Sequence, residues 1–193
     1  GLGGFSITRG DERFYIQTAV TMPESGHYLV PTYLGKLHLN KPPLMNWLAL
    51  ASCKVFGFSL WAARLPALFA GALVVSLTFL IALRLYGDRM TSLMAGLMGV
   101  SSYGLYLHSR VALTDMVMLC GLLLLFLQAL KFIDGDRSHL TGFIAALGIG
   151  IAVMAKGHVG FVLALLPCVA MCVVERKTLR TIPPAQLMSP AFW

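Results

Sequence analysis

The chain has 193 residues, of which 58% are hydrophobic and only 12% are charged, whereas soluble domains carry about 25% charged residues. So thin a charged coat could not cover that much apolar surface, which disfavours a soluble enzyme, a disordered chain and a disulfide scaffold. The net charge of +7 does not indicate nucleic-acid binding, because the basic residues lie mostly between apolar runs and form no stripe interleaved with aromatic residues. The composition predicts a polytopic membrane protein.

Residues 1–60 are predicted to lie outside the membrane-spanning part. Apolar side chains recur with helical spacing in residues 11–25 and again in residues 42–56. Pro42 and Pro43 suit the first turn of the second helix. Both helices are too short or too polar to cross a bilayer, so we expect them to lie in the membrane interface.

Residues 61–180 contain about five apolar stretches that approach the ~20 residues needed for a span. Lipid offers backbone groups no partners, so each stretch must be helical, and the short connections predict an antiparallel bundle. The expected spans are 65–83, 90–107, 116–130 (extendable to 133), 140–155 and 159–174. Residues 181–193 are interpreted as a truncated connection.

Basic residues in the connections predict the orientation of the bundle. One side holds Arg84, Arg89, Lys131, Arg137, Arg176, Lys177 and Arg180. The short loops of the other side hold only Arg110 and Lys156. The positive-inside rule places the first side in the cytoplasm and residues 1–60 outside.

The predicted topology gathers a set of ionisable residues on the outer face, where such groups at membrane depth usually mark a site. The set consists of Asp11, Glu12, Lys41, Arg64, Arg110, Asp115 and Lys156. Lys41 precedes two prolines that stiffen its segment, and a rigidly placed ammonium beside a membrane suits a phosphate group.

Each of these residues also has an ordinary structural interpretation. Asp115 could stabilise the N-terminus of its helix by capping free N–H groups, and Asp11 with Glu12 could be a solvated pair before a helix. The lysines and Arg64 could extend toward the interface from apolar segments, and Arg110 could pair with Asp115. The sequence leaves these alternatives open.

No metal site is predicted from the spacing of possible ligands. His38 and His158 could approach the acids and hold a divalent cation, but no ligand motif supports this. The four cysteines have no metal-ligand spacing and are interpreted as small core residues.

An ordered set of short motifs resembles one enzyme family. It comprises Asp11–Tyr15, Gly26–Pro31, Asn40–Leu44, Trp47, Phe56–Gly57, Ala62–Pro66, Arg110–Asp115 and Ala155–Gly157. The order resembles that of membrane glycosyltransferases related to protein O-mannosyltransferases, especially the bacterial lipid A aminoarabinose transferases. Asn40 stands where those transferases often carry an acid, so the resemblance does not by itself imply a metal site or the aminoarabinose donor.

The resemblance implies an all-α GT-C bundle, with about five transmembrane helices and two interfacial helices in the first outer loop. It implies an enzyme of the bacterial inner membrane that moves a sugar from a polyprenyl-phosphate carrier to a lipid or protein acceptor on the periplasmic side. No cofactor is required by this reading. We also expect a further transmembrane helix before residue 1 and more helices after residue 193.

The resemblance also implies roles for particular residues. Asp11 and Asp115 are the expected catalytic residues. The residues expected to bind substrate are Glu12, Tyr15, Lys41, Arg64, Arg110 and Lys156.

The chemistry is consistent with these roles. Cations such as Lys41 could stabilise the charge that develops on a leaving phosphate, and Asp11 could act as base for an acceptor hydroxyl. The alternatives are a transporter or lipid flippase module and a purely structural membrane subunit. A transport path would need charges at the centres of the spans, whereas the charges here cluster at the span ends.

Overall fold

The computed structural model describes residues 10–33, 36–37 and 41–174, although the side chains of residues 10–11, 32, 37 and 170–174 fall outside that description. The helices are α1 (Gly10–Ser25), α2 (Leu44–Phe56), α3 (Leu60–Tyr86), α4 (Arg89–Ser101), α5 (Tyr103–His108), α6 (Asp115–Ile133), α7 (His139–Lys156) and α8 (His158–Val174). Two short strands, β1 (Thr32–Tyr33) and β2 (Lys36–Leu37), pair antiparallel. The expected all-α class is confirmed apart from this small hairpin, which the sequence pattern did not indicate.

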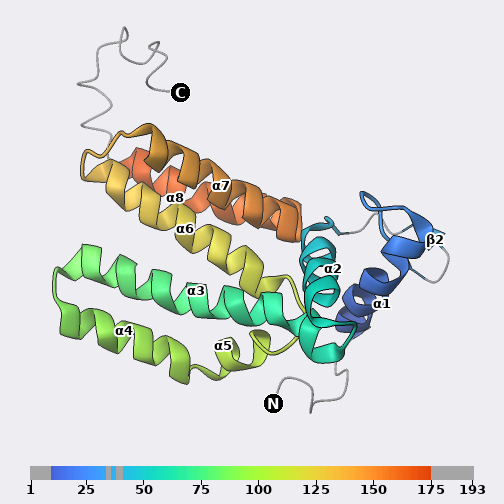
Figure 1. The fold of residues 1–193 in the computed structure, drawn as a ribbon. Helices are drawn as coiled ribbons and strands as arrows, with labels where there is room; N and C mark the ends of the chain where they lie inside the picture. The colour runs from blue at the N-terminus through green and yellow to red at the C-terminus, as the bar shows by residue number, and fades with distance from the viewer. Residues whose placement is uncertain (1–9, 34–35, 38–40, 175–193) are drawn as a thin grey trace, which may run out of the picture.

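The long helices α3, α4, α6, α7 and α8 lie side by side, and α1 and α2 pack across one end of this bundle (Figure 1). At that end α3 and α6 begin and α7 finishes, and we call it the site end. The earlier expectation of helices at 11–25 and 42–56 is confirmed, although α2 begins only at Leu44, with Pro43 as its N-cap residue.

Three helices, α3, α6 and α7, are long and apolar enough to cross a membrane, and the described part of α8 is a shorter apolar helix. The chain is therefore a multi-pass membrane protein, and helices long enough to span occupy the stretches expected at 65–83, 116–130 (extendable to 133) and 140–155. The helix α3 begins at Leu60, where the side chain of Ser59 caps it by accepting a hydrogen bond from the N–H of Ala62 at 3.3 Å.

The prediction of one continuous span over residues 90–107 is wrong. The helix α4 ends at Ser101 and α5 begins at Tyr103, because Ser102 between them has an extended backbone with φ −67° and ψ 121°. Glycine and serine are weak helix formers, and they are frequent around this break. The apolar pattern continues through the break, which is why hydropathy alone did not reveal it.

Close contact between glycines fixes the spacing of α6 and α7. A Cβ atom added to Gly121 would lie 2.7 Å from the carbonyl oxygen of Gly148, and one added to Gly148 would lie 2.7 Å from that of Gly121. Small residues allow helix backbones to approach in this way in membrane proteins. The first residue of α6 is thereby held beside the last residue of α7.

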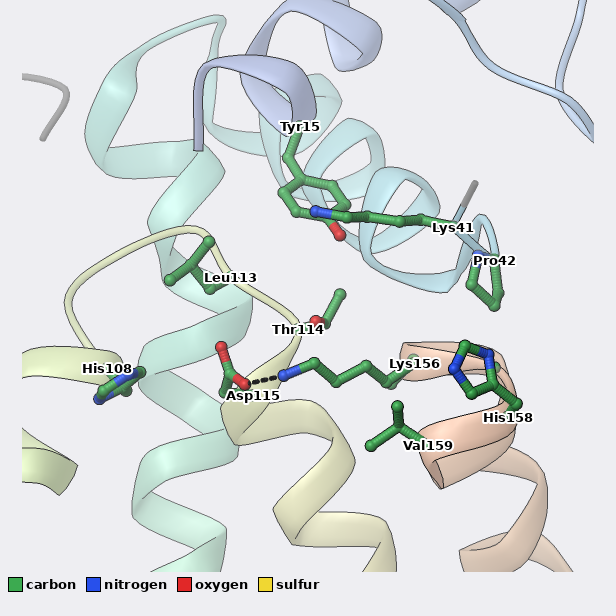
Figure 2. A pocket seen from close by; sticks show the side chains of 12 residues that line it. Tyr15, Lys41, Pro42, His108, Leu113, Thr114, Asp115, Lys156, His158 and Val159 are labelled. Carbon is green, nitrogen blue, oxygen red and sulfur yellow. Dashed lines mark hydrogen bonds and ion pairs between the residues drawn. The ribbon is translucent and has the colours of Figure 1, made fainter. Parts of the chain in front are cut away.

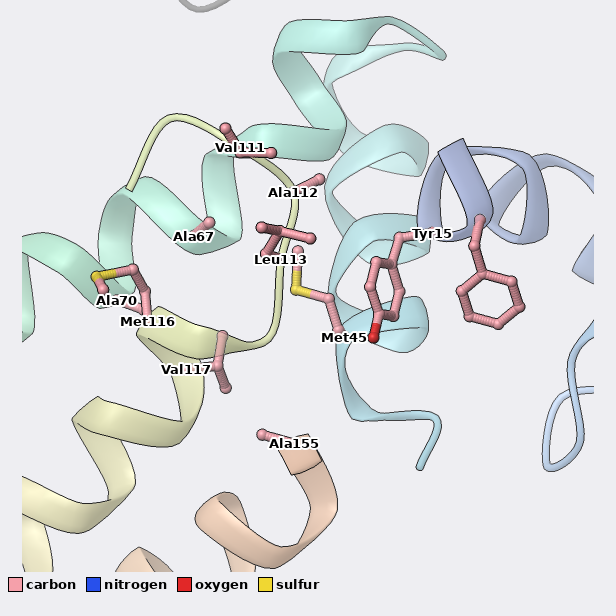
Figure 3. Close-up of a cluster of buried hydrophobic side chains, with 11 residues drawn as sticks. Tyr15, Met45, Ala67, Ala70, Val111, Ala112, Leu113, Met116, Val117 and Ala155 are labelled. Atoms are coloured by element: carbon pink, nitrogen blue, oxygen red, sulfur yellow. The ribbon is translucent and has the colours of Figure 1, made fainter. Parts of the chain in front are cut away.

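A buried apolar cluster holds the site end together (Figure 3). It is drawn from α1, α2, α3, α6, α7 and the loop between α5 and α6. Its members are Phe14, Tyr15, Met45, Ala67, Ala70, Val111, Ala112, Leu113, Met116, Val117 and Ala155. The helices α1 and α2 are therefore anchored to the bundle by side-chain packing, and a buried hydrogen bond of 2.9 Å from Asn46 to the hydroxyl of Thr18 joins α2 to α1.

The opposite end of the bundle has its own ion pair. The Arg84 guanidinium, at the end of α3, lies 2.6 Å from the Asp134 carboxylate in the loop after α6. Arg89, Lys131 and Arg137 lie at this same end, as the predicted topology required. The predicted connection at residues 181–193 lies outside the described residues.

Candidate functional site

A cavity of about 430 Å³ opens at the site end and is lined by residues from widely separated parts of the chain (Figure 2). Its polar lining consists of Tyr15, Lys41, His108, Thr114, Asp115, Lys156 and His158. Four of the residues predicted from the sequence, namely Tyr15, Lys41, Asp115 and Lys156, therefore meet in one hollow.

An ion pair between Asp115 and Lys156 crosses this cavity (Figure 2). Asp115 is the first residue of α6 and Lys156 the last residue of α7, so the antiparallel packing of the two helices brings them together. The side chains remain 30% and 40% exposed, respectively. The positive end of the α6 dipole also stabilises a carboxylate at this position. Asp115 can therefore stabilise the start of its helix and line the cavity at the same time.

Lys41 enters the cavity from the segment before α2. Its ammonium nitrogen lies 5.5 Å from the centre of the Tyr15 ring, a distance at which a cation is attracted to an aromatic face. Tyr15 is itself 1% exposed and packs edge-on against Phe14, with ring centres 5.1 Å apart. The cavity thus holds two ammonium groups, those of Lys41 and Lys156, and the carboxylate of Asp115.

A glycine places the start of α8 at the cavity. Gly157 has φ +59°, a conformation that residues with a Cβ rarely adopt. It separates Lys156, which ends α7, from His158, which begins α8. The ring of Pro42 lies close to Gly157, with its Cγ 3.6 Å from the position that a Cβ atom would take. The chain therefore reverses within a single residue, and both neighbours line the cavity.

Glu12 and Arg64 are placed differently from what the sequence led us to expect. Both side chains are completely buried and paired with each other, with 2.7 Å between Arg64 Nε and Glu12 Oε1 and 3.0 Å between Arg64 Nη2 and Glu12 Oε2. Neither side chain lines the cavity. Their burial does not fit direct contact with a substrate and indicates a role within the protein.

Arg110 is not brought to the cavity, and the side chain of Asp11 lies outside the described residues. The guanidinium carbon of Arg110 lies 4.2 Å from the centre of the Tyr106 ring, and Arg110 is not part of the cavity lining. Asp11 lies in the first turn of α1, but its side chain falls outside the described residues. Its catalytic role stays a prediction.

Two histidines line the cavity from opposite sides (Figure 2). His158 was considered from the sequence as a possible metal ligand, whereas His108 was missed as a lining residue. The sequence feature that could have identified His108 as a lining residue is its position at the start of the loop before Asp115. His38 lies outside the described residues, and the described part of the chain contains no group of three or more His, Cys, Asp or Glu side chains that could hold a metal ion.

An apolar groove of about 520 Å³ runs along α2, α3, α6 and α7 beside the cavity. Val117 and Ile151 line the groove, whereas Asp115 and Ala155 on the same helices line the cavity. On α7 the two lining residues are therefore about one helical turn apart, and on α6 they are only two positions apart. A charged cavity and an apolar groove side by side suit a ligand with a charged head and an apolar tail.

Comparisons with known proteins give the same picture. Residues 9–184 match the family described as dolichyl-phosphate-mannose-protein mannosyltransferase. The protein named undecaprenyl phosphate-alpha-4-amino-4-deoxy-L-arabinose arabinosyl transferase from Pseudomonas aeruginosa is 30% identical over 86% of this chain and 31% of its own length. A similarly named transferase from Sodalis glossinidius is 26% identical over 89% of this chain and 32% of its own length.

A solved structure shares the fold. The crystal structure of ArnT from Cupriavidus metallidurans bound to undecaprenyl phosphate matches 91% of this chain and 33% of its own chain, with a TM-score of 0.80 and 22% sequence identity. The chain spans about a third of the length of the relatives it matches. The family match covers most of the sequence, and the chain therefore belongs to the dolichyl-phosphate-mannose-protein mannosyltransferase family of membrane glycosyltransferases.

Proposed function

We propose that this chain forms part of a glycosyltransferase that moves a sugar from a polyprenyl-phosphate carrier to a lipid or protein acceptor. The observation that carries the proposal is the convergence of Lys41, Lys156 and Asp115 in one cavity at the site end, beside an apolar groove. The names of the transferase relatives, which specify undecaprenyl phosphate, support this class of donor.

The two hollows match the two chemical parts of the donor, its phosphate head and its isoprenoid tail. The phosphate head fits the cavity, where the ammonium groups of Lys41 and Lys156 can stabilise the negative charge that develops as the phosphate leaves. The isoprenoid tail fits the groove, which is lined mainly by apolar side chains, among them Leu48, Phe69 and Val117. A carrier with this shape would keep its tail in an apolar environment while its head remains polar.

The proposed reaction is a single inverting displacement. The bond between the sugar's anomeric carbon and the carrier phosphate breaks, and the phosphate leaves with the electron pair. The acceptor oxygen forms the new bond, and its proton passes to the carboxylate of Asp11, acting as general base. Asp115 orients the acceptor or the sugar. The steps proposed here use no metal ion. In the alternative, a divalent cation takes part, and chelation tests it.

We further propose that the site end faces the periplasm and that the protein resides in the bacterial inner membrane. The connections at the opposite end carry Arg84, Arg89 and Arg137, and short loops rich in arginine and lysine stay in the cytoplasm. A polyprenyl-linked donor would then be used on the outer side of the membrane.

The test uses membranes from cells that express the complete open reading frame encoding this chain. Transfer of labelled sugar from a polyprenyl-phosphate donor is measured for the wild type, Asp11→Asn, Lys41→Ala and Asp115→Asn, with Arg84→Gln as a control at the far end of the bundle. We expect the three site variants to lose transfer and the control to retain it. Equal turnover in all variants would remove the site assignment, and lipid movement without any sugar transfer would favour a flippase.

A further inference from the structure

The carboxylate of Glu12 has a second kind of partner besides Arg64. Its Oε1 atom accepts a hydrogen bond from the backbone N–H of Ala112 at 3.0 Å, while the same oxygen also receives Arg64 Nε at 2.7 Å. Glu12, Arg64 and Ala112 are each 0% exposed. One buried carboxylate thus joins α1, α3 and the loop at residues 109–114.

That loop leads directly into the cavity. Ala112 lies three residues before Asp115, and Leu113 and Thr114 between them line the cavity. The N–H of Leu113 bonds the carbonyl of Val111 at 2.7 Å, so the loop is tightly turned at the point where Glu12 holds it. A displacement of Ala112 would therefore be passed to the first residue of α6.

Arg64 connects Glu12 to α3, a helix long and apolar enough to span the membrane. Arg64 belongs to α3, and its planar guanidinium grips both oxygens of the Glu12 carboxylate, which sets the orientation of that group. Buried ion pairs contribute little net stability compared with apolar packing. The pair can, however, orient the loop at residues 109–114, because the buried Ala112 N–H needs an acceptor. Apolar residues in place of the pair could not supply that acceptor.

We infer that Glu12 is a positioning residue, which holds Asp115 in place through the Ala112 N–H while Arg64 fixes Glu12 itself. The inference rests on the proposed function, because it assigns Glu12 a part in sugar transfer. It also differs from a substrate-binding role, since Glu12 acts from behind the cavity wall. Lys41 and Lys156 reach the cavity from other segments, so Glu12 should affect turnover rather than donor affinity.

The experiment compares Glu12→Gln with Thr18→Val in the complete protein. Glutamine has one acceptor oxygen and no charge, and it places an NH₂ donor against Arg64 Nη2 where Glu12 Oε2 now accepts. Arg64 can then no longer hold the group from both oxygens, so the orientation of the oxygen that accepts from Ala112 is lost. Thr18→Val removes the buried hydrogen bond from Asn46, so it also weakens the packing of α1 but leaves the loop at 109–114 untouched. Transfer kinetics, binding of undecaprenyl phosphate alone, and amide hydrogen exchange in residues 109–114 are measured for both.

We expect Glu12→Gln to lower kcat by about 10-fold to 100-fold, the effect of a small displacement of a catalytic group. The KM for donor and the affinity for undecaprenyl phosphate should stay within about twofold of wild type. Exchange in residues 109–114 should accelerate in Glu12→Gln and not in Thr18→Val. If Glu12→Gln gives too little folded protein, Glu12→Asp keeps the charge, shortens the side chain and should show the same split.

The outcomes separate this inference from the proposed function. Weaker donor binding with unchanged kcat would place Glu12 among the binding residues and overturn the positioning role. Equal losses of kcat in Glu12→Gln and Thr18→Val would reduce Glu12 to a stabilising residue. Absence of transfer by the wild type with any polyprenyl-phosphate sugar would overturn the proposed function, whereas a fully active Glu12→Gln variant would overturn the inference alone.

Discussion

Asp115 and Lys156 close the α6–α7 hairpin with an ion pair that also spans the cavity. The pair is partly exposed, and exposed ion pairs contribute only about 0–1 kcal/mol to stability. The proposed role of the pair therefore depends on its position at the cavity rather than on its contribution to folding.

This placement gives the first prediction, that Asp115→Asn lowers turnover much more than stability. We expect transfer to fall by about 10²-fold or more, the range found for residues that assist proton transfer or orientation. The free energy of unfolding should change by less than about 1 kcal/mol. Initial rates and thermal unfolding in detergent measure the two effects, and a large loss of stability with normal turnover of the folded fraction would contradict the prediction.

The contact between Gly121 and Gly148 gives the second prediction. Gly148→Ala should destabilise the protein by about 1–3 kcal/mol, because the added Cβ would meet the backbone of α6 and force the helices apart. Gly150→Ala is the matched control, since it lies on the same helix and a Cβ there meets nothing within 4 Å. Denaturant or thermal unfolding in detergent should separate the two variants, and equal stabilities would argue against the close helix crossing.

The third prediction concerns pH and the loop between α6 and α7. The backbone N–H of Ser138 donates to Asp136 at 3.1 Å, and this bond, followed by the one from Thr141, holds the Asp136 pKa below its usual value. A lowered folded-state pKa means that the stabilisation is present above the unfolded-state pKa of about 3.9 and is lost as pH falls through the folded-state value.

Asp136→Asn should therefore be less stable than the wild type near neutral pH, and the difference should shrink below about pH 4. Unfolding measured across this range in detergent checks the sign. A difference that is constant down to strongly acidic pH would show that the charge on Asp136 has no part in the effect.

The fourth prediction is that chelation of divalent cations leaves sugar transfer unchanged. The described residues hold no cluster of three or more possible metal ligands, and the two ammonium groups in the cavity can stabilise a leaving phosphate. Transfer is measured before and after treatment with a chelator and again after addition of Mg²⁺ or Zn²⁺. Loss of transfer that an added cation restores would establish a metal requirement.

Much of the architecture follows from apolar patterning. The spans in α3, α6 and α7 were predictable because lipid leaves a long apolar segment only the helical state. The break at Ser102 was not predictable in this way, because hydropathy records the composition of a segment and not its backbone continuity. The β1–β2 hairpin was missed because strands of two residues are too short to show an alternating pattern.

The candidate site was predicted in its charged members but not in their arrangement. Lys41, Asp115 and Lys156 could be gathered because each lies at the end of an apolar segment on the same predicted side. The sequence could not show that Glu12 and Arg64 would pair with each other away from the cavity, since residues 52 positions apart carry no local signal of contact. Charge and predicted topology thus gathered the candidate residues, and only packing separated those that line the cavity from those that do not.

The single-residue reversal at Gly157 makes the connection between α7 and α8 intolerant of changes in length. One inserted residue would rotate α8 by about 100° around its axis and shift it by about 1.5 Å. That rotation would carry His158 off the cavity wall and would turn Gly160, which lies against the backbone of Ala152, away from its partner helix. The connection between α6 and α7 is longer and does not reverse within a single residue, so insertions and deletions among relatives should accumulate there and spare residue 157.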